Sequence, residues 1–153
     1  MPTLDDIRTA IAAGISSVPG VGMVHTFERF AKANSEFRPL YESAGKILGW
    51  NVRRVRTEEK SDAAGQWMVT HTWSIKGFMG LDDGGDSELV FDRLVEAIRD
   101  RFRADETLGG VVDTTVVEDV AGIQVDDSGP VMFAGVLCHS VKLRLVTRHW
   151  IQG

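Results

Sequence analysis

Residues 67–76 read WMVTHTWSIK, and bulky side chains alternate in this run with mostly smaller polar ones. An alternation with a period of two is typical of a β-strand that buries one of its faces. The same period recurs in residues 47–52 (ILGWNV). Because residues 61–65 (SDAAG) between the two runs have the composition of a polar turn, the two runs together predict a long β-hairpin.

The clearest helical pattern of the chain follows this hairpin, over residues 87–103. Apolar residues recur there at spacings of three and four, which places them on one face of an α-helix. Asp86 or Ser87 is positioned to cap the first turn. On the other face, Glu96–Arg99 and Asp100–Arg103 are spaced to form ion pairs. The face expected to be buried consists of Phe91, Leu94, Val95, Ile98 and Phe102.

Another helix is expected near the amino end, over residues 3–13. Thr3 is a suitable cap for its first turn, and Gly14 is expected to end it. Pro39 interrupts a stretch of helical composition, so residues 28–43 are expected to hold a loop and a short helix.

The rest of the chain predicts β-structure. Residues 23–27 suit a short strand, residues 111–125 are rich in valine and threonine, and residues 137–145 alternate strongly. Residues 126–130 (DDSGP) predict a turn. These elements favour an α+β fold, a mostly antiparallel sheet with two or three helices packed on one face, in a single domain spanning residues 1–153.

Composition narrows the classes of function. The chain has a net charge of −5, which argues against broad contact with a nucleic-acid backbone. A local exception is the basic run at residues 53–56 (RRVR), but the acids that follow it favour a solvated strand face. With one cysteine and no signal-peptide pattern at the start, we expect a reducing cytoplasm. No apolar run approaches the ~20 residues that span a bilayer.

The histidines are the first candidates for chemistry. His71 and His139 both fall on apolar strand faces, so they could meet across the sheet and bind a metal ion. Zinc, however, takes three or four ligands, and no Cys/His/Asp cluster with ligand spacing accompanies them, so hydrogen-bonded core histidines are the favoured interpretation. Cys138 and His139 are neighbours on a strand and point to opposite faces, which excludes a nucleophile–base pair. We therefore expect no enzyme activity, no catalytic residue, no metal and no cofactor.

The tryptophans divide into two groups. Trp50, Trp67 and Trp73 lie on strand faces that we expect in the core. Trp150 lies close to the carboxyl end, where it either folds back on the sheet or contacts a neighbouring subunit. Both alternatives remain open from the sequence.

Six short runs follow one another between about residues 7 and 150. They are residues 15–30 (ISSVPGVGMVHTFERF), 49–54 (GWNVRR), 71–78 (HTWSIKGF), 91–98 (FDRLVEAI), 105–110 (DETLGG) and 138–139 (CH). In order and spacing they resemble the tail terminator, or tail completion, proteins of long-tailed bacteriophages and prophages. None of the runs encodes chemistry, and the resemblance covers most of the chain.

The resemblance implies a structural protein of the virion, located in the tail or neck and assembled in the host cytoplasm. Tail terminators form a ring, typically of six copies, at the head-proximal end of the tail tube. The ring ends tube polymerisation and gives the head connector a docking surface. The implied partners are therefore other copies of the chain, the tail tube protein and the head–tail connector. DNA passes through the lumen without specific binding, and no membrane is involved.

A cyclic ring needs two different contact patches on each subunit. Loops that become ordered on contact suit such patches, and residues 61–65, 80–88 and 126–130 are the candidates. Two alternatives remain: a neighbouring head–tail joining (neck) protein, and a small metal- or ligand-binding α/β domain that uses His71 and His139. The candidate interface residues are Leu81, Asp82, Asp83, Asp86, Arg53, Arg54, Arg56, Arg148 and Trp150.

Overall fold

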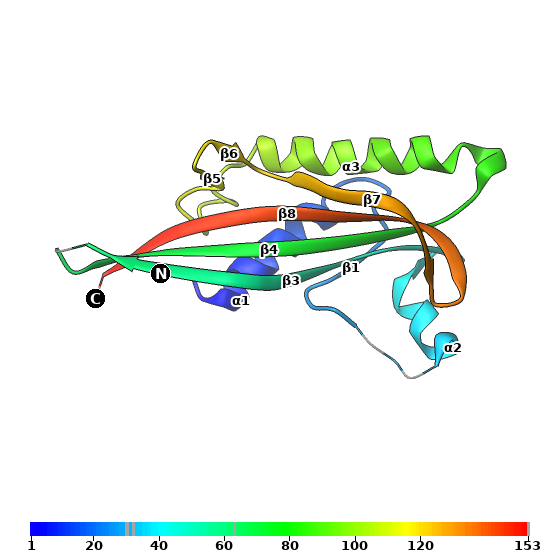
Figure 1. The fold of residues 1–153 in the computed structure, drawn as a ribbon, viewed down its shortest axis with the longest axis horizontal. Coiled ribbons are helices and arrows are strands. Elements are labelled where there is room, and N and C mark those ends of the chain that lie inside the picture. The colour runs from blue at the N-terminus through cyan, green and yellow to red at the C-terminus, as the bar shows by residue number, and fades with distance from the viewer. Residues whose placement is uncertain (30, 32, 63, 153) are drawn as a thin grey trace.

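Two helices lie along one face of a long, curved sheet in the computed structural model, which describes all residues except 30, 32, 63 and 153 (Figure 1). The sheet is mostly antiparallel, so the α+β class expected from the sequence is confirmed. The helical elements are α1 (Leu4–Ser16), α2 (Asn34–Phe37) and α3 (Ser87–Arg103), with 3₁₀ turns η1 (Arg38–Tyr41) and η2 (Asp83–Gly85). The strands are β1 (Met23–His25), β2 (Glu42–Ser43), β3 (Lys46–Ser61), β4 (Gln66–Gly80), β5 (Val116–Val117), β6 (Val120–Ala121), β7 (Gln124–Phe133) and β8 (Val136–Gln152).

The predicted hairpin is confirmed and forms the centre of the sheet. β3 and β4 pair antiparallel, from Leu48 opposite Met79 to Ser61 opposite Trp67. β8 lies on the other side of β4 and is antiparallel to it, and β7 flanks β8, so the strand order is β1-β3-β4-β8-β7. β1 is parallel to β3 and covers only a short part of its outer edge.

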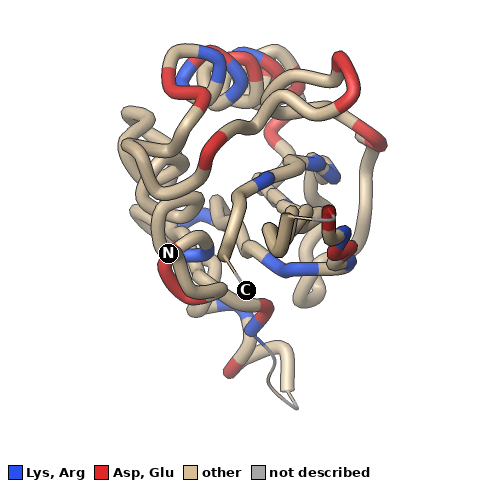
Figure 2. The backbone as a smooth tube through the Cα atoms, turned by 90° about the vertical axis from the view of Figure 1, so that its left-hand side faces the viewer, with Lys and Arg blue, Asp and Glu red and all other residues tan. Residues whose placement is uncertain are grey.

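One end of the sheet extends past both long helices (Figure 1). It consists of residues 58–62 and 64–70 of the hairpin and residues 148–152 of β8, and we call it the arm. Seen along the long axis of the molecule, the sheet is strongly curled, with α3 above it (Figure 2).

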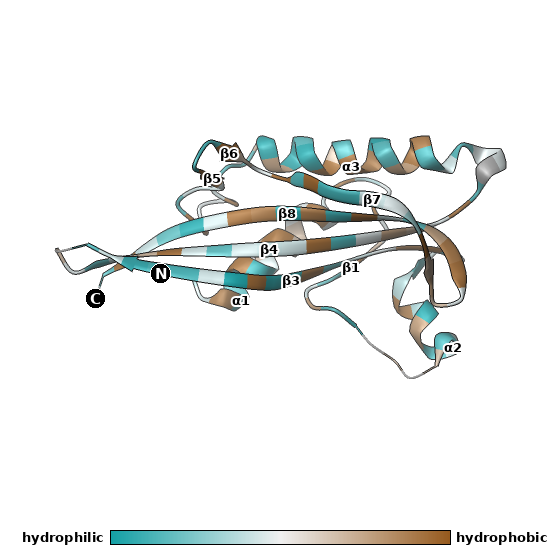
Figure 3. Cartoon of the chain, viewed as in Figure 1, coloured by the Kyte–Doolittle hydropathy of each residue, from teal (hydrophilic) through white to brown (hydrophobic). Residues whose placement is uncertain are grey.

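The two faces of the sheet have different surroundings. We call the face that packs on α1 and α3 the helix face; it includes the buried side chains of Trp73 and Leu143. We call the opposite face, which includes Thr72 and Lys142, the polar face. Hydrophobic residues concentrate in the middle of the strands and on the sheet side of α3, whose outer side is hydrophilic (Figure 3).

Close packing of aromatic rings defines the core under the helices. Trp50 stacks on Phe91 of α3 with ring centroids 5.7 Å apart, and its indole nitrogen donates to the carbonyl of Val21 at 2.7 Å. Gly77 makes room for this indole, since a Cβ there would lie 2.1 Å from Cζ3 of Trp50. Because Trp50 of β3 and Phe91 of α3 occupy this space, β4 needs a glycine at position 77.

The first helix begins as predicted but ends later. Thr3 and Asp6 form a reciprocal capping box at its amino end. Gly14 does not end the helix, which continues to Ser16. A Cβ at Gly14 would lie 2.9 Å from Cζ of Phe102, so this glycine allows α1 and α3 to approach each other rather than terminating a helix.

α3 confirms the predicted buried face, with Leu94 only partly buried, and both predicted ion pairs. Its cap differs from the expectation. Asp86 occupies the cap position with a left-handed backbone (φ 54°), and its side chain makes no capping hydrogen bond. The Ser87 hydroxyl instead accepts from the amide of Asp82 at 2.8 Å, which closes the loop and not the helix end.

A smaller cluster covers one end of the polar face. Tyr41 of η1 packs there with Ile47 and Cys138, so the short helical segment lies on the opposite side of the sheet from α1 and α3. Gly49 provides the space, since a Cβ there would lie 2.6 Å from Cδ1 of Tyr41. Cys138 is fully buried, as expected of a small apolar filler, and burial raises the pKa of its thiol to about 11.

Residues 126–130 do not form the predicted turn; they lie inside β7. β7 is an edge strand, which tolerates Pro130 because outward N–H groups need no partner in the sheet. A bulge between Val125 and Asp127 accommodates the acids. The actual turn to β8 uses Ala134 and Gly135, both with positive φ. Upstream, the β-structure expected over residues 111–125 is limited to the two-residue strands β5 and β6, an isolated bridge at Thr114 and the start of β7.

Candidate functional site

Four of the candidate interface residues lie together in the loop between β4 and α3. Leu81 continues the sheet by donating its amide to the carbonyl of Leu137 at 3.1 Å, and its side chain is exposed. Asp82 accepts from the amides of Gly85 and Ser87 through its own carbonyl. Asp83 begins the turn η2, and Asp86 ends the loop. The loop is therefore held by its backbone, and the exposed carboxylates of Asp82 and Asp86 are available for contacts.

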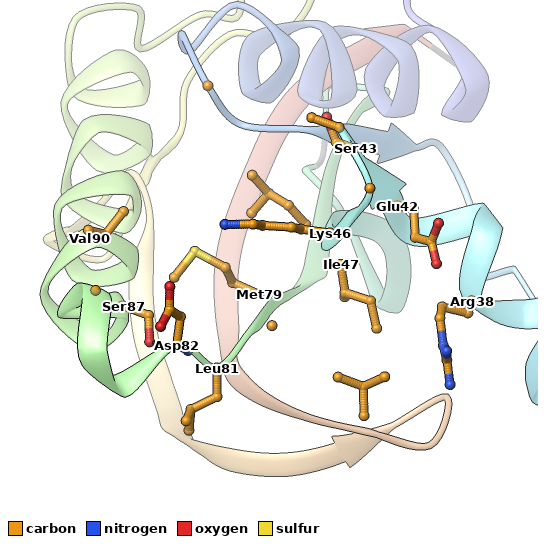
Figure 4. A pocket seen from close by; sticks show the side chains of 17 residues that line it. Arg38, Glu42, Ser43, Lys46, Ile47, Met79, Leu81, Asp82, Ser87 and Val90 are labelled. Carbon is orange, nitrogen blue, oxygen red and sulfur yellow. Dashed lines mark hydrogen bonds between the residues drawn. The ribbon is translucent and has the colours of Figure 1, made fainter.

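This loop borders a pocket of about 770 Å³ (Figure 4). Its other walls come from the β2–β3 turn and from the amino end of α3. Lys46 extends toward α3, on the side where Asp82 lies, and Arg38 and Glu42 lie together on the other side of the view (Figure 4). Ile47 is among its apolar lining residues. Apart from Asp82, the sequence did not single out these residues, because they belong to the stretch whose structure Pro39 leaves ambiguous or to the turn after it.

The two histidines considered as a metal pair do not meet. His71 lies opposite Thr147, and His139 lies opposite Met79, so eight residue steps, about 26 Å, separate them along the same strands. His139 is joined to the Ser87 hydroxyl by a 2.7 Å hydrogen bond. It also stacks on Phe91 of α3. In the described part of the chain, no three His, Cys, Asp or Glu residues are placed to hold a metal ion.

His71 has a different neighbour, His149, which no local sequence pattern indicates. The two buried rings lie 5.7 Å apart on the helix face. His71 Nδ1 shares a 2.7 Å hydrogen bond with the Thr57 hydroxyl, whereas the buried Nδ1 of His149 has no hydrogen-bond partner among the described residues. Burial, then the nearby charges of His149 and Arg54, lowers the pKa of His71 to about 4. Burial also lowers the pKa of His149.

The basic run is split between the two faces of the sheet. A bulge lies between Arg54 and Arg56, so Arg54 lies opposite Trp73 on the helix face. Arg53 and Arg56 are on the polar face. Arg56 pairs with Glu58 at 3.1 Å, and Lys60 pairs with the same carboxylate at 3.3 Å, all with substantial exposure. The interpretation as a compensated, solvated strand face is thus confirmed for Arg56, whereas Arg53 is exposed and forms no ion pair among the described residues.

The last two candidates lie at the arm. Arg148 donates to the Thr70 hydroxyl at 3.1 Å across the polar face. The Trp150 side chain is 47% exposed, while its amide donates to Asp113 at 2.7 Å. Trp67 was expected in the core but is 38% exposed, because it lies in the arm. Trp50 and Trp73 are fully buried, as expected.

The candidate residues therefore gather in two places. The loop residues lie at the end of the sheet near α2, and the arginines and Trp150 lie on the polar face and the arm, apart from Arg54 on the helix face. The chain matches no protein-family model, and no curated protein matches it. Among the described residues, no helix combines the length and apolar character needed to cross a membrane.

Proposed function

We propose that this chain is a structural subunit that assembles into a ring of the phage-tail type, at the head-proximal end of the tail tube. There it ends tube polymerisation and provides the docking surface for the head connector. The observation that carries the proposal is the pair of open sheet edges, which are not equivalent. Support for the identity of the ring comes from the resemblance of the chain to tail terminators.

The first open edge belongs to β3. β1 and β2 pair with residues 46–51 of this strand, and from Arg53 to Ser61 its outer edge has no strand partner among the described residues. The second belongs to β7, whose outer edge is open from Gln124 to Phe133 in the described structure. Unpaired N–H and C=O groups on an edge favour the addition of another strand.

Two different edges on opposite sides of one sheet favour head-to-tail contact. The open edge of β7 in one copy would meet the open edge of β3 in the next, and such a contact closes into a ring when its rotation permits. β3 and β7 run in opposite directions within the sheet, so their pairing between copies would continue the antiparallel pattern. Six copies of a 16.8 kDa chain would give a particle of about 101 kDa.

Particle mass tests this proposal, by mass photometry together with electron microscopy. We expect rings for the wild type and disrupted rings for Met132→Lys, because an added lysine on the edge strand opposes strand addition. Met132 is 66% exposed, so the fold should tolerate the change. Leu89→Lys is the matched control, since Leu89 is 51% exposed on α3 and belongs to neither edge strand. A wild-type chain that stays monomeric at high concentration would contradict the proposal.

A neighbouring head–tail joining protein is the second candidate, since it would also form a ring. Deleting the gene separates the two roles. Loss of a terminator leaves tails of uncontrolled length without heads, whereas loss of a joining protein leaves headless tails of normal length. The structure gives no support to metal binding by His71 and His139, because they lie eight residue steps apart.

A further inference from the structure

The lysines and arginines of the sheet are concentrated on its polar face. Seven of the chain's 17 basic residues lie there on β3, β4 and β8, although the chain as a whole has a net charge of −5. The strands contribute fewer acids to this face: Glu42 on β2, Glu58 on β3, Asp127 on β7 and Asp126 in the β7 bulge. The seven basic residues are Arg53, Arg56, Lys60, Lys76, Lys142, Arg144 and Arg148.

Ion pairs neutralise only part of this charge. Arg144 pairs with Asp126 at 3.1 Å, and Lys76 lies 3.9 Å from Glu28. Arg56 and Lys60 share one carboxylate, that of Glu58. In the part of the chain that the structure describes, Arg53, Lys142 and Arg148 have no carboxylate within ion-pair distance. The face therefore keeps a surplus of positive charge.

The polar face contains a hollow that is bordered by basic side chains. Between β3, β4, β8 and the β5–β6 turn lies a hollow of about 330 Å³. Guanidinium groups from two strands border it, and the hydroxyls of Thr70 and Thr72 lie between them. Glu58 of β3 and Glu118 of the β5–β6 turn also border it, so the charges around the hollow are of both signs. The strands that carry these basic residues lie near the middle of the molecule in the view along its long axis, whereas α3 carries both signs (Figure 2).

We infer that the polar face contacts the phosphate backbone of double-stranded DNA, weakly and without sequence preference. Arginine and lysine on a strand face contact phosphates well, whereas reading of bases requires side chains that reach a groove. The inference rests on the proposed function in one respect: a tail ring surrounds DNA, and this face would line the passage. The inference departs from the expectation drawn from the net charge of −5, because a chain with a negative total charge can still carry a positive surface on one face.

Salt dependence of binding to a labelled duplex of about 30 base pairs tests the inference, because each phosphate contact adds about 0.9 to the slope of log affinity against log salt. The test variant changes Arg53, Arg56 and Lys142 to alanine, and all three side chains are exposed. The control changes Arg93, Arg101 and Arg103 of α3 to alanine, which removes the same charge from the other side of the molecule. Fluorescence anisotropy is measured from about 25 to 200 mM NaCl.

We expect salt-dependent binding by the wild type and by the control. For the test variant we expect a slope reduced by about 0.9 for each phosphate that it no longer neutralises. No wild-type binding at the lowest salt, or equally weakened binding by both variants, would overturn the inference. The inference would also be overturned if the test variant bound DNA as the wild type does but no longer bound tail tubes. The polar face would then be a contact surface for a protein. Particle mass, measured on the same samples, separates failure of the inference from failure of the proposed function. If the chain forms rings that do not bind DNA, only the inference is contradicted.

Discussion

Burial lowers the pKa of both histidines in the His71–His149 pair. The pKa of His71 is lowered from 6.5 to about 4, mainly by burial and then by His149 and Arg54. As pH falls below 6.5, His71 becomes protonated in the unfolded chain, whereas in the folded chain it stays neutral until about pH 4. The free energy of unfolding therefore decreases across this window, and Asp113 and Glu59, which face His149, oppose part of its own shift.

The variant His71→Gln isolates this contribution. Glutamine does not titrate, so between about pH 7.5 and 4.5 the variant should gain about 2.5 kcal/mol relative to the wild type. Urea unfolding at the two pH values measures the difference, and the carboxylates that titrate in both proteins cancel. A gap between variant and wild type that is the same at both pH values would show that His71 is not held neutral by its surroundings.

Gly77 shows how one missing side chain can determine the packing of a core. Gly77→Ala should destabilise the fold by about 3 kcal/mol, because the new Cβ would lie 2.1 Å from Cζ3 of the buried Trp50 indole. Gly129→Ala is the matched control, since a Cβ there meets nothing within 4 Å and the strand position is an edge. Its unfolding free energy should change by only about 0.5 kcal/mol. Thermal unfolding of both variants compares them, and equal losses of stability would contradict the packing argument.

At the scale of the element, the contribution of the α1 capping box to stability can be compared with that of a threonine inside the same helix. Thr3→Ala removes the hydroxyl that accepts from the amide of Asp6 at 3.1 Å, and should cost about 1 kcal/mol. Thr9→Ala makes the same substitution at an exposed position inside α1, where alanine is the better helix former. The two variants should therefore change the unfolding free energy in opposite directions. If both variants lose similar stability, the effect of Thr3→Ala comes from the loss of a threonine side chain in general and not from the loss of the cap.

The elements that the sequence predicted well are those with a strong period. The β3–β4 hairpin keeps a period of two, and α3 keeps apolar residues at spacings of three and four, over many residues. One or two exceptions therefore do not obscure either pattern. The failures involve residues whose local preference is overridden by their place in the sheet. DDSGP has turn composition, yet an edge strand with a bulge accepts it, while the real turn uses Ala134, which carries no turn signal of its own.

The candidate site was predictable only in part, for a related reason. The loop of residues 81–86 and the basic run are visible in composition alone. The pairing of His71 with His149 depends on strand register, which fixes neighbours 78 positions apart in the chain. The positive polar face depends in addition on the bulge at residues 54–56, which sends Arg54 to the opposite face from Arg53 and Arg56. Neither feature has a local signature.

At the scale of the whole molecule, the arm separates exposed aromatic surface from the core. Trp67 lies on its helix face and Trp150 on its polar face, so the two indoles project from opposite sides of the same three strands. Charged or small side chains would suit an arm in permanent contact with water. Half-exposed tryptophans are typical of surfaces that become buried on association.

The double variant Trp67→Ser, Trp150→Ser tests whether the arm takes part in assembly. Because both indoles are exposed and lie beyond the helices, the unfolding free energy of the monomer should fall by only about 1 kcal/mol. The concentration at which rings dissociate should rise, as followed by mass photometry over a dilution series. Phe27→Ser is the control, an aromatic residue that is 54% exposed, two residues after β1 and outside the arm. If the control weakens the rings as much as the double variant, removal of exposed aromatic surface in general explains the effect, and the arm has no special part in the contact between copies.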